Sequence, residues 1–290
     1  MKKLIRIGQI SYINCLVFNY PLDLLLKDDS RLESEIKNYK KLQELGYEIE
    51  TVKGVPRKLN SLLNENKLDI APISSFEFLR HNNSSSSEEG YELIPKASIS
   101  SIGKVKSVIF FTNIPPKDLT KVYLSNESAS SVGLLKILLK DKYAHDLSKL
   151  DFKKFEGYGN ELENKLLIGD KALEKIQNHN YKYALDLGEE WYQFTEELPM
   201  VFGLWAHRLD NDCAKLVSDL VHELKNYALE NLLEDIIIEA YRKTGISKKV
   251  LYDYFNELNF DFDAKHEEAL SKYETYLLKN ELIKKHSQAL

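Results

Sequence analysis

Two segments carry the most information about the fold: Leu166-Leu167-Ile168-Gly169-Asp170-Lys171-Ala172-Leu173 and, after it, Asp186-Leu187-Gly188-Glu189-Glu190-Trp191. Each segment runs from apolar, strand-like residues through a polar turn into a helix-like sequence. Two such units so close together predict polar groups, Gly169 and Asp170 among them, at the carboxyl ends of parallel strands. Open α/β sheets bind small ligands at that edge, so the segments predict a ligand cleft without identifying its occupant.

Composition and charge are those of an ordinary soluble globular protein. The chain has 290 residues, of which 43% are hydrophobic and 29% charged, enough for one large or two medium domains. A formal net charge of −5 attracts neither nucleic acid nor an anionic membrane, so we expect neither as a partner. The widely separated Cys15 and Cys213 indicate reduced thiols in a cytoplasmic protein. No leader-type segment follows Lys2 and Lys3, and no apolar run is long enough to span a membrane.

Strand-like and helix-like segments alternate along the first half of the chain. The predicted strands are 4–10, 47–52 and 68–73, and the predicted helices are 20–26, 56–64 and 76–79. This order favours an α/β fold with a largely parallel sheet covered by helices. Residues 81–90 read as a polar surface loop, and His81 gains no ligand role from its position there.

The second half predicts a second lobe and a helical C-terminus. Its strand-like runs are 105–112, 122–124 and 199–205, and its Leu-rich helix is 132–139. Beyond Asn211 only amphipathic helices follow, one of them capped by Ser247, with apolar stripes that we assign to the core. We expect one lobe from residues 1–104 and 200–290 and another from 105–199, with 105–112 and 199–205 as the crossovers and the ligand between the lobes.

The sequence has no Walker-type phosphate loop, no Rossmann glycine triplet, no nucleophile elbow and no histidine pair at metal-binding spacing. These absences argue against nucleotide, nicotinamide and zinc chemistry. What remains is a set of small polar residues at turns before helices, namely Ser11, Tyr12, Asn14, Ser74, Ser75, Ser128, Ser130 and Ser131. Amides and hydroxyls at helix starts suit a carboxylate or phosphate, although helix capping explains any single serine equally well.

Four larger side chains each have two readings. Arg57, at a helix start, either pairs with a ligand carboxylate or is a solvated surface residue. Asp170 and Asp186 either hold their turns or face the cleft. Trp191 either forms an apolar wall for a ring-bearing ligand or is buried in the core.

An ordered set of motifs runs from residue 4 to about residue 208. In order they are Ser11-Tyr12-Ile13-Asn14-Cys15, Gly54-Val55-Pro56 with Leu59-Asn60, Asp69-Ile70-Ala71-Pro72-Ile73-Ser74-Ser75, Ile102-Gly103 with Ser107-Val108, the helix start at 128–131, the two opening segments and 198–205. This set resembles the chorismate dehydratase family of the futalosine route to menaquinone. One departure is Thr195-Glu196-Glu197-Leu198-Pro199, where the family has Thr-Gly-Leu-Pro, so that one residue is inserted and the glycine is lost.

The resemblance implies a two-lobed fold similar to type II periplasmic binding proteins. It also implies conversion of chorismate to 3-[(1-carboxyvinyl)oxy]benzoate with loss of water, by a monomer or homodimer without metal or organic cofactor. Asn14 would orient the substrate as the catalytic residue. The expected substrate-binding residues are Ser11, Tyr12, Arg57, Ser74, Ser75, Ser107, Ser128, Ser130, Ser131, Gly169, Asp170 and Trp191. No residue stands out as the general base, and the enolpyruvyl carboxylate of the substrate is a candidate.

Three other readings remain open. One is a non-catalytic binding protein for small carboxylates with the same fold, because a fold alone does not establish catalysis. Another is the related 1,4-dihydroxy-6-naphthoate synthase, against which Ser11-Tyr12-Ile13-Asn14-Cys15 and Ile168-Gly169-Asp170 argue. The third is a nucleic-acid or regulatory effector domain, which lacks a basic surface here.

Overall fold

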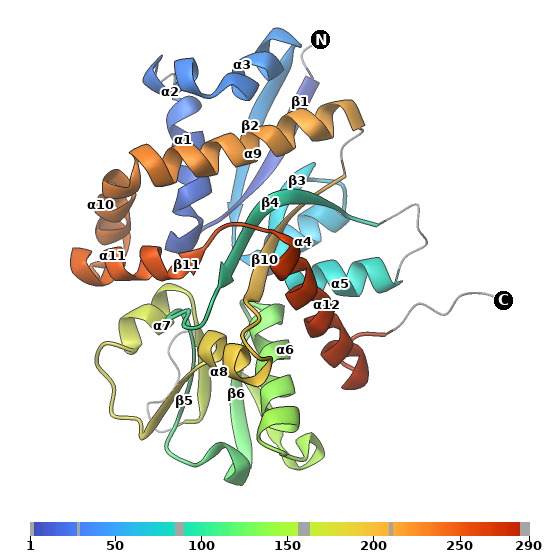
Figure 1. Cartoon of the computed structure of the whole chain (residues 1–290), viewed down its shortest axis with the longest axis vertical. Helices are drawn as coiled ribbons and strands as arrows, with labels where there is room; N and C mark the ends of the chain where they lie inside the picture. The colour runs from blue at the N-terminus through green and yellow to red at the C-terminus, as the bar shows by residue number, and fades with distance from the viewer. Residues whose placement is uncertain (1–2, 28–29, 85–89, 156–162, 209–210, 285–290) are drawn as a thin grey trace, which may run out of the picture.

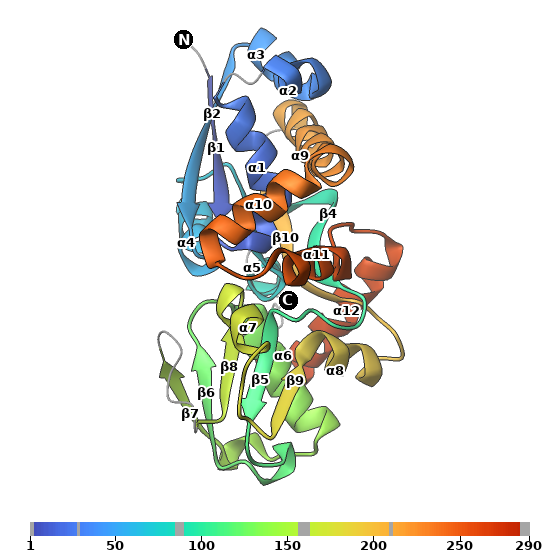
Figure 2. The same ribbon diagram turned by 90° about the vertical axis from the view of Figure 1, so that its left-hand side faces the viewer.

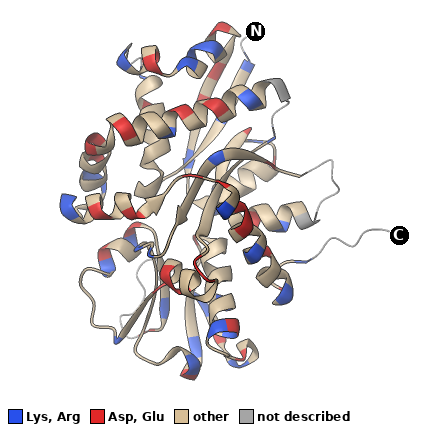
Figure 3. Cartoon of the chain, viewed as in Figure 1, with Lys and Arg blue, Asp and Glu red and all other residues tan. Residues whose placement is uncertain are grey.

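The computed structural model contains two β-sheets, one in each of two lobes (Figure 1). It describes residues 3–27, 30–84, 90–155, 163–208 and 211–284. Among these residues no helix is long and apolar enough to cross a membrane. Basic and acidic residues are interspersed on the helices of both lobes (Figure 3).

The larger sheet has six strands in the order β11–β4–β10–β3–β1–β2. They are β1 (Lys3–Ile10), β2 (Tyr47–Gly54), β3 (Ile70–Ser74), β4 (Glu92–Ser101), β10 (Met200–His207) and β11 (Leu258–Asn259). β1 is parallel to β2 and β3, whereas β10 is antiparallel to β3 and β4. The prediction of a parallel sheet therefore holds for the first three strands, and the second half of the sheet is antiparallel.

The smaller sheet has five strands in the order β7–β6–β8–β5–β9. They are β5 (Val108–Thr112), β6 (Lys121–Ser125), β7 (Asp151–Phe155), β8 (Lys165–Ile168) and β9 (Tyr183–Asp186). β8 and β9 flank β5, and both are antiparallel to it. The two strands of the opening segments thus run in the same direction without pairing, and their carboxyl ends point toward the larger lobe (Figure 2).

Helices cover both sheets, and α9 lies across α1 and α3 (Figure 1). The α-helices are α1 (Leu16–Leu25), α2 (Ser30–Glu35), α3 (Lys37–Glu44), α4 (Pro56–Asn64), α5 (Ser75–Ser84), α6 (Ala129–Ile137), α7 (Asp170–Lys175), α8 (Leu187–Phe194), α9 (Asn211–Asn231), α10 (Leu233–Thr244), α11 (Lys248–Glu257) and α12 (Ala264–Lys279). Short helical turns are η1 (Ile13–Cys15), η2 (Pro116–Asp118), η3 (Leu138–Lys142) and η4 (Leu147–Lys149).

The chain crosses between the sheets just before β5 and just before β10. The predicted crossovers 105–112 and 199–205 are therefore wrong in detail: most of each run is a strand within a sheet. Every residue of β5 and of β10 is buried. Apolar runs this continuous belong in sheet cores, whereas a connection between lobes carries polar backbone that water can solvate.

Two helices differ from their predicted bounds. α1 begins at Leu16 and contains Pro21, whereas the prediction began at residue 20. α5 continues to Ser84, so residues 81–84 are helical and the predicted loop 81–90 is wrong there, while 85–89 lie outside the described residues. His81 is buried because its ring stacks on Tyr91 at 3.9 Å between centroids, and its Nε2 is 3.1 Å from the Asn64 side-chain oxygen.

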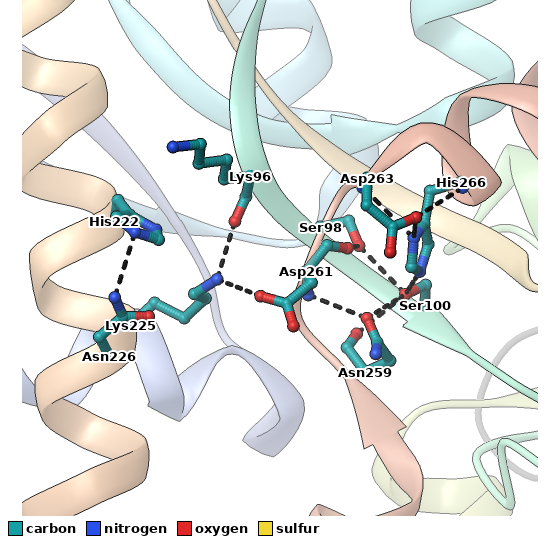
Figure 4. Close-up of polar contacts among 10 residues, drawn as sticks. All are labelled: Lys96, Ser98, Ser100, His222, Lys225, Asn226, Asn259, Asp261, Asp263 and His266. Atoms are coloured by element: carbon teal, nitrogen blue, oxygen red, sulfur yellow. Dashed lines mark hydrogen bonds and ion pairs between the residues drawn. The ribbon is translucent and has the colours of Figure 1, made fainter.

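A polar network fastens the segment between α11 and α12 to β4 (Figure 4). The buried Lys225 ammonium on α9 donates to the backbone oxygen of Lys96 at 2.8 Å and to the Asp261 carboxylate at 2.5 Å. The buried Ser100 hydroxyl lies 3.1 Å from His266 Nε2, and His266 Nδ1 lies 2.7 Å from the Asp263 carboxylate. This network fixes the start of α12, which then reaches the smaller lobe, where the Tyr273 hydroxyl donates to the backbone oxygen of Ser130 at 2.9 Å.

Candidate functional site

A small cavity lies between the two sheets and is lined by residues of both. It measures about 60 Å³. Its lining residues are Ile10, Tyr12, Asn14, Cys15, Pro56, Ile73, Ser74, Ile99, Val105, Ser107, Val108, Ser128, Ser131, Ile168, Gly169, Phe202 and Gly203. Seven expected site residues are among them: Tyr12, Asn14, Ser74, Ser107, Ser128, Ser131 and Gly169. The cavity is mostly apolar, with hydroxyls and one amide converging on it.

Gly169 forms the wall of the cavity on the side of the smaller lobe. Its φ of +66° is a left-handed conformation that a side chain would strain, and it turns the chain from β8 into α7. A Cβ at this position would lie only 3.2 Å from the Tyr12 ring of the opposite lobe. The Gly169 N–H also donates to the Ser107 backbone oxygen at 2.7 Å. Glycine here lets the two lobes approach each other closely.

Asn14 presents an amide to the cavity from η1, directly after β1. Its side-chain oxygen is buried and has no hydrogen-bond partner among the described residues. A buried amide oxygen without a partner has lost its hydration, which lowers the stability of the folded protein unless a ligand or water supplies a donor. Asn14 therefore has spare hydrogen-bonding capacity at the cavity wall.

Tyr254, on α11, supports this wall from behind. Its buried hydroxyl donates to the Ser107 hydroxyl at 3.0 Å. Burial raises the pKa of Tyr254, although the adjacent Ser107 and Asn14 side chains lower it in part. Tyr254 thus stays protonated and orients Ser107. Tyr254 belongs to the apolar stripe of the Ser247-capped helix, which we assigned to the core, and nothing in that stripe distinguishes its hydroxyl.

The serines at helix starts divide into two groups. Ser74 accepts from the Glu77 N–H at 3.2 Å, and Ser128 accepts from the Ser131 N–H at 3.3 Å, so these serines cap α5 and α6 while lining the cavity. Ser75 and Ser130 are fully buried and lie 2.9 Å apart, hydroxyl to hydroxyl, where the two helices meet. They lie outside the cavity lining and join the lobes.

The titratable groups among the lining residues are Tyr12 and Cys15. Burial raises the pKa of the Cys15 thiol, with a further contribution from Asp170. Burial and the neighbouring Glu127 carboxylate raise the pKa of Tyr12. Both groups therefore stay neutral at neutral pH. No carboxylate, imidazole or amine belongs to this lining set, so it contains no side chain suited to act as general base near pH 7.

Besides Ser75 and Ser130, four expected site residues lie outside the cavity lining. Arg57 is exposed and borders hollows outside the cavity. Ser11 and Asp170 line a separate groove beside α1 and α10, although the Asp170 carboxylate also accepts from the Ile13 N–H at 3.2 Å. Trp191 is fully buried, and its indole N–H donates to the Pro199 backbone oxygen at 3.1 Å. The structure thus places Trp191 in the core, because α8 turns that face toward α12.

Asp186 is a structural residue at the second opening segment. Its carboxylate accepts from the backbone N–H groups of Val105 and Lys106 and caps α8 through Gly188 and Glu189. These contacts hold the first crossover against α8. Gly188 permits this, since a Cβ there would lie 2.5 Å from the backbone oxygen of Gly103.

The departure at residues 195–199 has a local cost in the backbone. Glu196 and Glu197 have φ values of +54° and +76°, which residues other than glycine rarely adopt. The Glu197 N–H donates to the Tyr192 backbone oxygen at 2.9 Å, as in the glycine-containing turn that ends many helices. Both glutamates are exposed, and neither belongs to the cavity lining.

Comparison with known proteins gives both a family and a fold. A family model described as "Menaquinone biosynthesis" matches residues 5–279. The chorismate dehydratase of Thermus thermophilus is 32% identical over 219 residues, which cover 69% of this chain and 76% of that protein. A crystal structure of an Archaeoglobus fulgidus protein superimposes with a TM-score of 0.69 at 17% identity, covering 97% of this chain and 98% of that one.

A further structural relative is a periplasmic binding protein. The periplasmic aliphatic sulphonate-binding protein of Escherichia coli superimposes with a TM-score of 0.62 at 12% identity, covering 98% of this chain and 95% of that one. At this identity the likeness establishes only the fold. The two-lobed fold of periplasmic binding proteins, expected from the sequence, is thus confirmed.

Proposed function

The chain belongs to the chorismate dehydratase family of menaquinone biosynthesis, and from this premise we propose that it eliminates water from chorismate to give 3-[(1-carboxyvinyl)oxy]benzoate. The reaction is a carbon–oxygen lyase step of the futalosine route, in the cytoplasm, and needs no metal or organic cofactor. The expected substrate is a small dicarboxylate, and the cavity between the sheets is where it would react.

One observation carries the proposal: the hydroxyls and the amide that converge on an otherwise apolar cavity. Ser74, Ser128 and Ser131 stand at the starts of α5 and α6, where backbone N–H groups favour anions. Asn14 adds to the same cavity a buried side-chain oxygen that has no hydrogen-bond partner among the described residues. The ring carboxylate would be held at the helix starts, and the side-chain amide of Asn14 would orient the substrate.

The chemistry places modest demands on the protein. Removal of the C4 hydroxyl and the C3 proton makes the ring aromatic, and the ring carboxylate acidifies the C3 proton through the diene. Fixed donors at the ring carboxylate therefore lower the barrier by stabilising the negative charge that develops there. The remaining task is to hold one ring pucker in which the proton and the hydroxyl leave from the same face.

The proton acceptor in this proposal is the enolpyruvyl carboxylate of the substrate. The lining residues support this assignment, because Tyr12 and Cys15 stay protonated and no side chain in the set is a base near neutral pH. Asn14 would hold the enolpyruvyl arm over the ring, so that the carboxylate reaches the C3 proton. Tyr254 acts as a positioning residue through its hydrogen bond to Ser107.

The test is incubation of the purified protein with chorismate, followed by mass and NMR analysis of the product. We expect a product lighter by one water that carries an aromatic ring and an intact enolpyruvyl group. Binding of chorismate without product would favour a non-catalytic carboxylate-binding protein. Turnover of a cyclic futalosine precursor instead would favour the naphthoate synthase.

A further inference from the structure

Two adjoining hollows lie beside the cavity on the side of α4 and the β6–α6 turn. They measure about 420 Å³ and 410 Å³. Both are bordered by Arg57, Ser125, Asn126 and Glu127. We call the two hollows together the vestibule. It is far larger than the cavity, which measures about 60 Å³.

The vestibule adjoins the cavity through shared wall residues. Ser128 lines the cavity and one hollow, and Ile168 lines the cavity and the other hollow. Sites for small molecules commonly span about 300–1,000 Å³. The volume of the vestibule is within that range, whereas the volume of the cavity is well below it. A molecule of chorismate's size therefore fits the vestibule as it stands and enters the cavity only when the lobes part.

The vestibule is positively charged, although the chain as a whole is negative. Its cations are Arg57, Arg80, Lys154 and Lys171, and its carboxylates are Glu77 and Glu127. Arg80 pairs with Glu77 at 2.5 Å, and Lys171 pairs with Glu127 at 2.8 Å. Arg57 and Lys154 are exposed and have no ion pair among the described residues. Two positive charges thus remain uncompensated, in a chain with a net charge of −5.

A hydrogen-bonded bridge closes the wall between vestibule and cavity. The Tyr12 hydroxyl, from the larger lobe, donates to the Glu127 carboxylate of the smaller lobe at 2.8 Å. Lys171 donates to the other oxygen of the same carboxylate at 2.8 Å. The Tyr12 ring lies against Gly169 at the cavity wall. The bridge thus joins a residue of the cavity lining, Tyr12, to a residue of the vestibule lining, Glu127.

We infer that the vestibule is an outer binding site where Arg57 and Lys154 capture a dicarboxylate, and that the Tyr12–Glu127 bridge is the gate to the cavity. The identity of the dicarboxylate as chorismate rests on the proposed function. A ligand carboxylate in the vestibule competes with Glu127 for Lys171, which weakens the bridge and lets the lobes part. Arg57 then acts in capture, at a distance from the reacting atoms.

Capture by charge predicts a dependence on ionic strength. Two like charges at the mouth of a site raise the rate of association with a dianion, and salt screens the effect. In the Arg57→Gln/Lys154→Gln variant, we expect kcat/KM for chorismate to fall about fivefold to tenfold at about 20 mM salt, with kcat unchanged. The loss should nearly vanish at about 500 mM salt.

A matched variant controls for net charge. Lys117→Gln/Lys121→Gln removes the same two charges from exposed positions on η2 and at the far end of β6 from Ser125. It should keep the wild-type kcat/KM and its salt dependence. Equal effects of the two double variants, or a vestibule variant whose kcat/KM matches the wild type at low salt, would overturn the capture site.

The gate is tested by labelling of Cys15 with N-ethylmaleimide. Cys15 lines the cavity, whereas the buried Cys213 lies on α9 and serves as the internal reference in the same sample. Tyr12→Phe keeps the ring against Gly169 but removes the hydrogen bond to Glu127. We expect labelling of Cys15 to accelerate at least about threefold while Cys213 is unaffected. Unchanged Cys15 labelling, or equal acceleration at both thiols, would overturn the gate.

Calorimetry with benzene-1,3-dicarboxylate separates this inference from the proposed function. Weaker binding by the vestibule variant at low salt, with normal binding by the control variant, supports the capture site even if chorismate is not converted. If chorismate is converted and the two double variants behave identically, the result supports the dehydratase activity and excludes the vestibule as a capture site.

Discussion

Asn14 is the residue on which the proposed chemistry depends most. Its side-chain oxygen is buried at the cavity wall without a partner among the described residues. Such a group costs stability unless a ligand uses it, which is a common compromise at functional sites. Its neighbours Ser107 and Tyr254 fix the surroundings of the amide.

Replacement of Asn14 tests this role directly. Asn14→Ala should lower kcat for chorismate by about 10²–10³-fold, the range for loss of one preorganised polar group. The melting temperature should fall little or rise, since the side-chain oxygen that the variant removes is buried and has no partner among the described residues. The check is steady-state kinetics together with thermal unfolding. Turnover within a factor of two of wild type, in a folded variant, would remove Asn14 from the mechanism.

Glu196 carries the clearest backbone strain near the second crossover. It follows the last turn of α8 with a φ of +54°, the position where glycine usually ends a helix. The sequence comparison within the family already suggested a missing glycine here, and the structure shows its physical consequence. Glu196 is exposed, so its side chain contributes little packing in return.

Restoring glycine at that position should therefore stabilise the protein. We expect Glu196→Gly to raise the free energy of unfolding by about 0.5–1 kcal/mol, because glycine adopts a left-handed conformation without strain. Urea unfolding measures the change. The matched control is Glu196→Ala, which keeps the strain and should gain nothing. A Gly variant no more stable than the Ala variant would show that the turn stores no strain.

At the scale of elements, the sequence predicted best the helix starts that depend on contacts within a single turn. Pro56 at the first turn of α4 and the Ser247 cap of α11 act within one helical turn, and both are confirmed. β4 went unpredicted because its first half contains Pro95 and Lys96 and is largely exposed, so it lacks the continuous apolar run of a buried strand. The helical extension to Ser84 was also missed, since a run of Asn and Ser favours loops and tertiary packing of His81 overrides it.

The start of α12 provides an element-scale prediction. The Asp263 carboxylate caps the helix by accepting from the Lys265 and His266 N–H groups at 2.9 and 3.1 Å (Figure 4). Its hydrogen bond with the His266 ring is the main reason that its pKa is lowered. Asp263→Ala should cost about 1 kcal/mol of unfolding free energy at pH 7, the usual value of a lost cap.

The pH dependence of this loss has a definite sign. A carboxylate whose pKa is lower in the folded state stabilises above its unfolded pKa of about 3.9 and loses that contribution as pH falls through the folded value. The difference between Asp263→Ala and wild type should therefore shrink as pH falls from about 5 to about 3. Asp253→Ala, at an exposed site on α11, is the control. A constant difference across this range would exclude the ionised cap.

At the scale of the whole molecule, the sequence predicted the two-lobed fold, and seven of the expected site residues line the cavity. Residues next to strand ends, such as Asn14, Ser74 and Gly169, reach the cavity because the fold brings those ends together. Trp191 and Arg57 lie elsewhere, because helix orientation and lobe packing decide which way a side chain points. Tyr254 was missed since a buried helical tyrosine gives no sequence signal of its hydrogen bond across 147 positions to Ser107.

A substrate carboxylate as proton acceptor predicts a simple pH profile. The pKa values of Tyr12 and Cys15 are raised, so neither group titrates near neutrality. We expect kcat/KM to be flat from about pH 6 to about pH 9 and to fall only in acid, where the substrate carboxylates protonate. Initial rates across this range, in buffers of constant ionic strength, provide the check. A bell-shaped profile centred near pH 7 would indicate a protein base instead.

The most direct test of the central claim is a product balance for chorismate. Purified protein, treated with EDTA and desalted, is incubated with chorismate, and the loss of substrate and the formation of product are quantified together. The proposed elimination predicts one 3-[(1-carboxyvinyl)oxy]benzoate for each chorismate consumed, and a rate far lower with Asn14→Ala. Chorismate recovered intact after incubation with folded wild-type protein would contradict it.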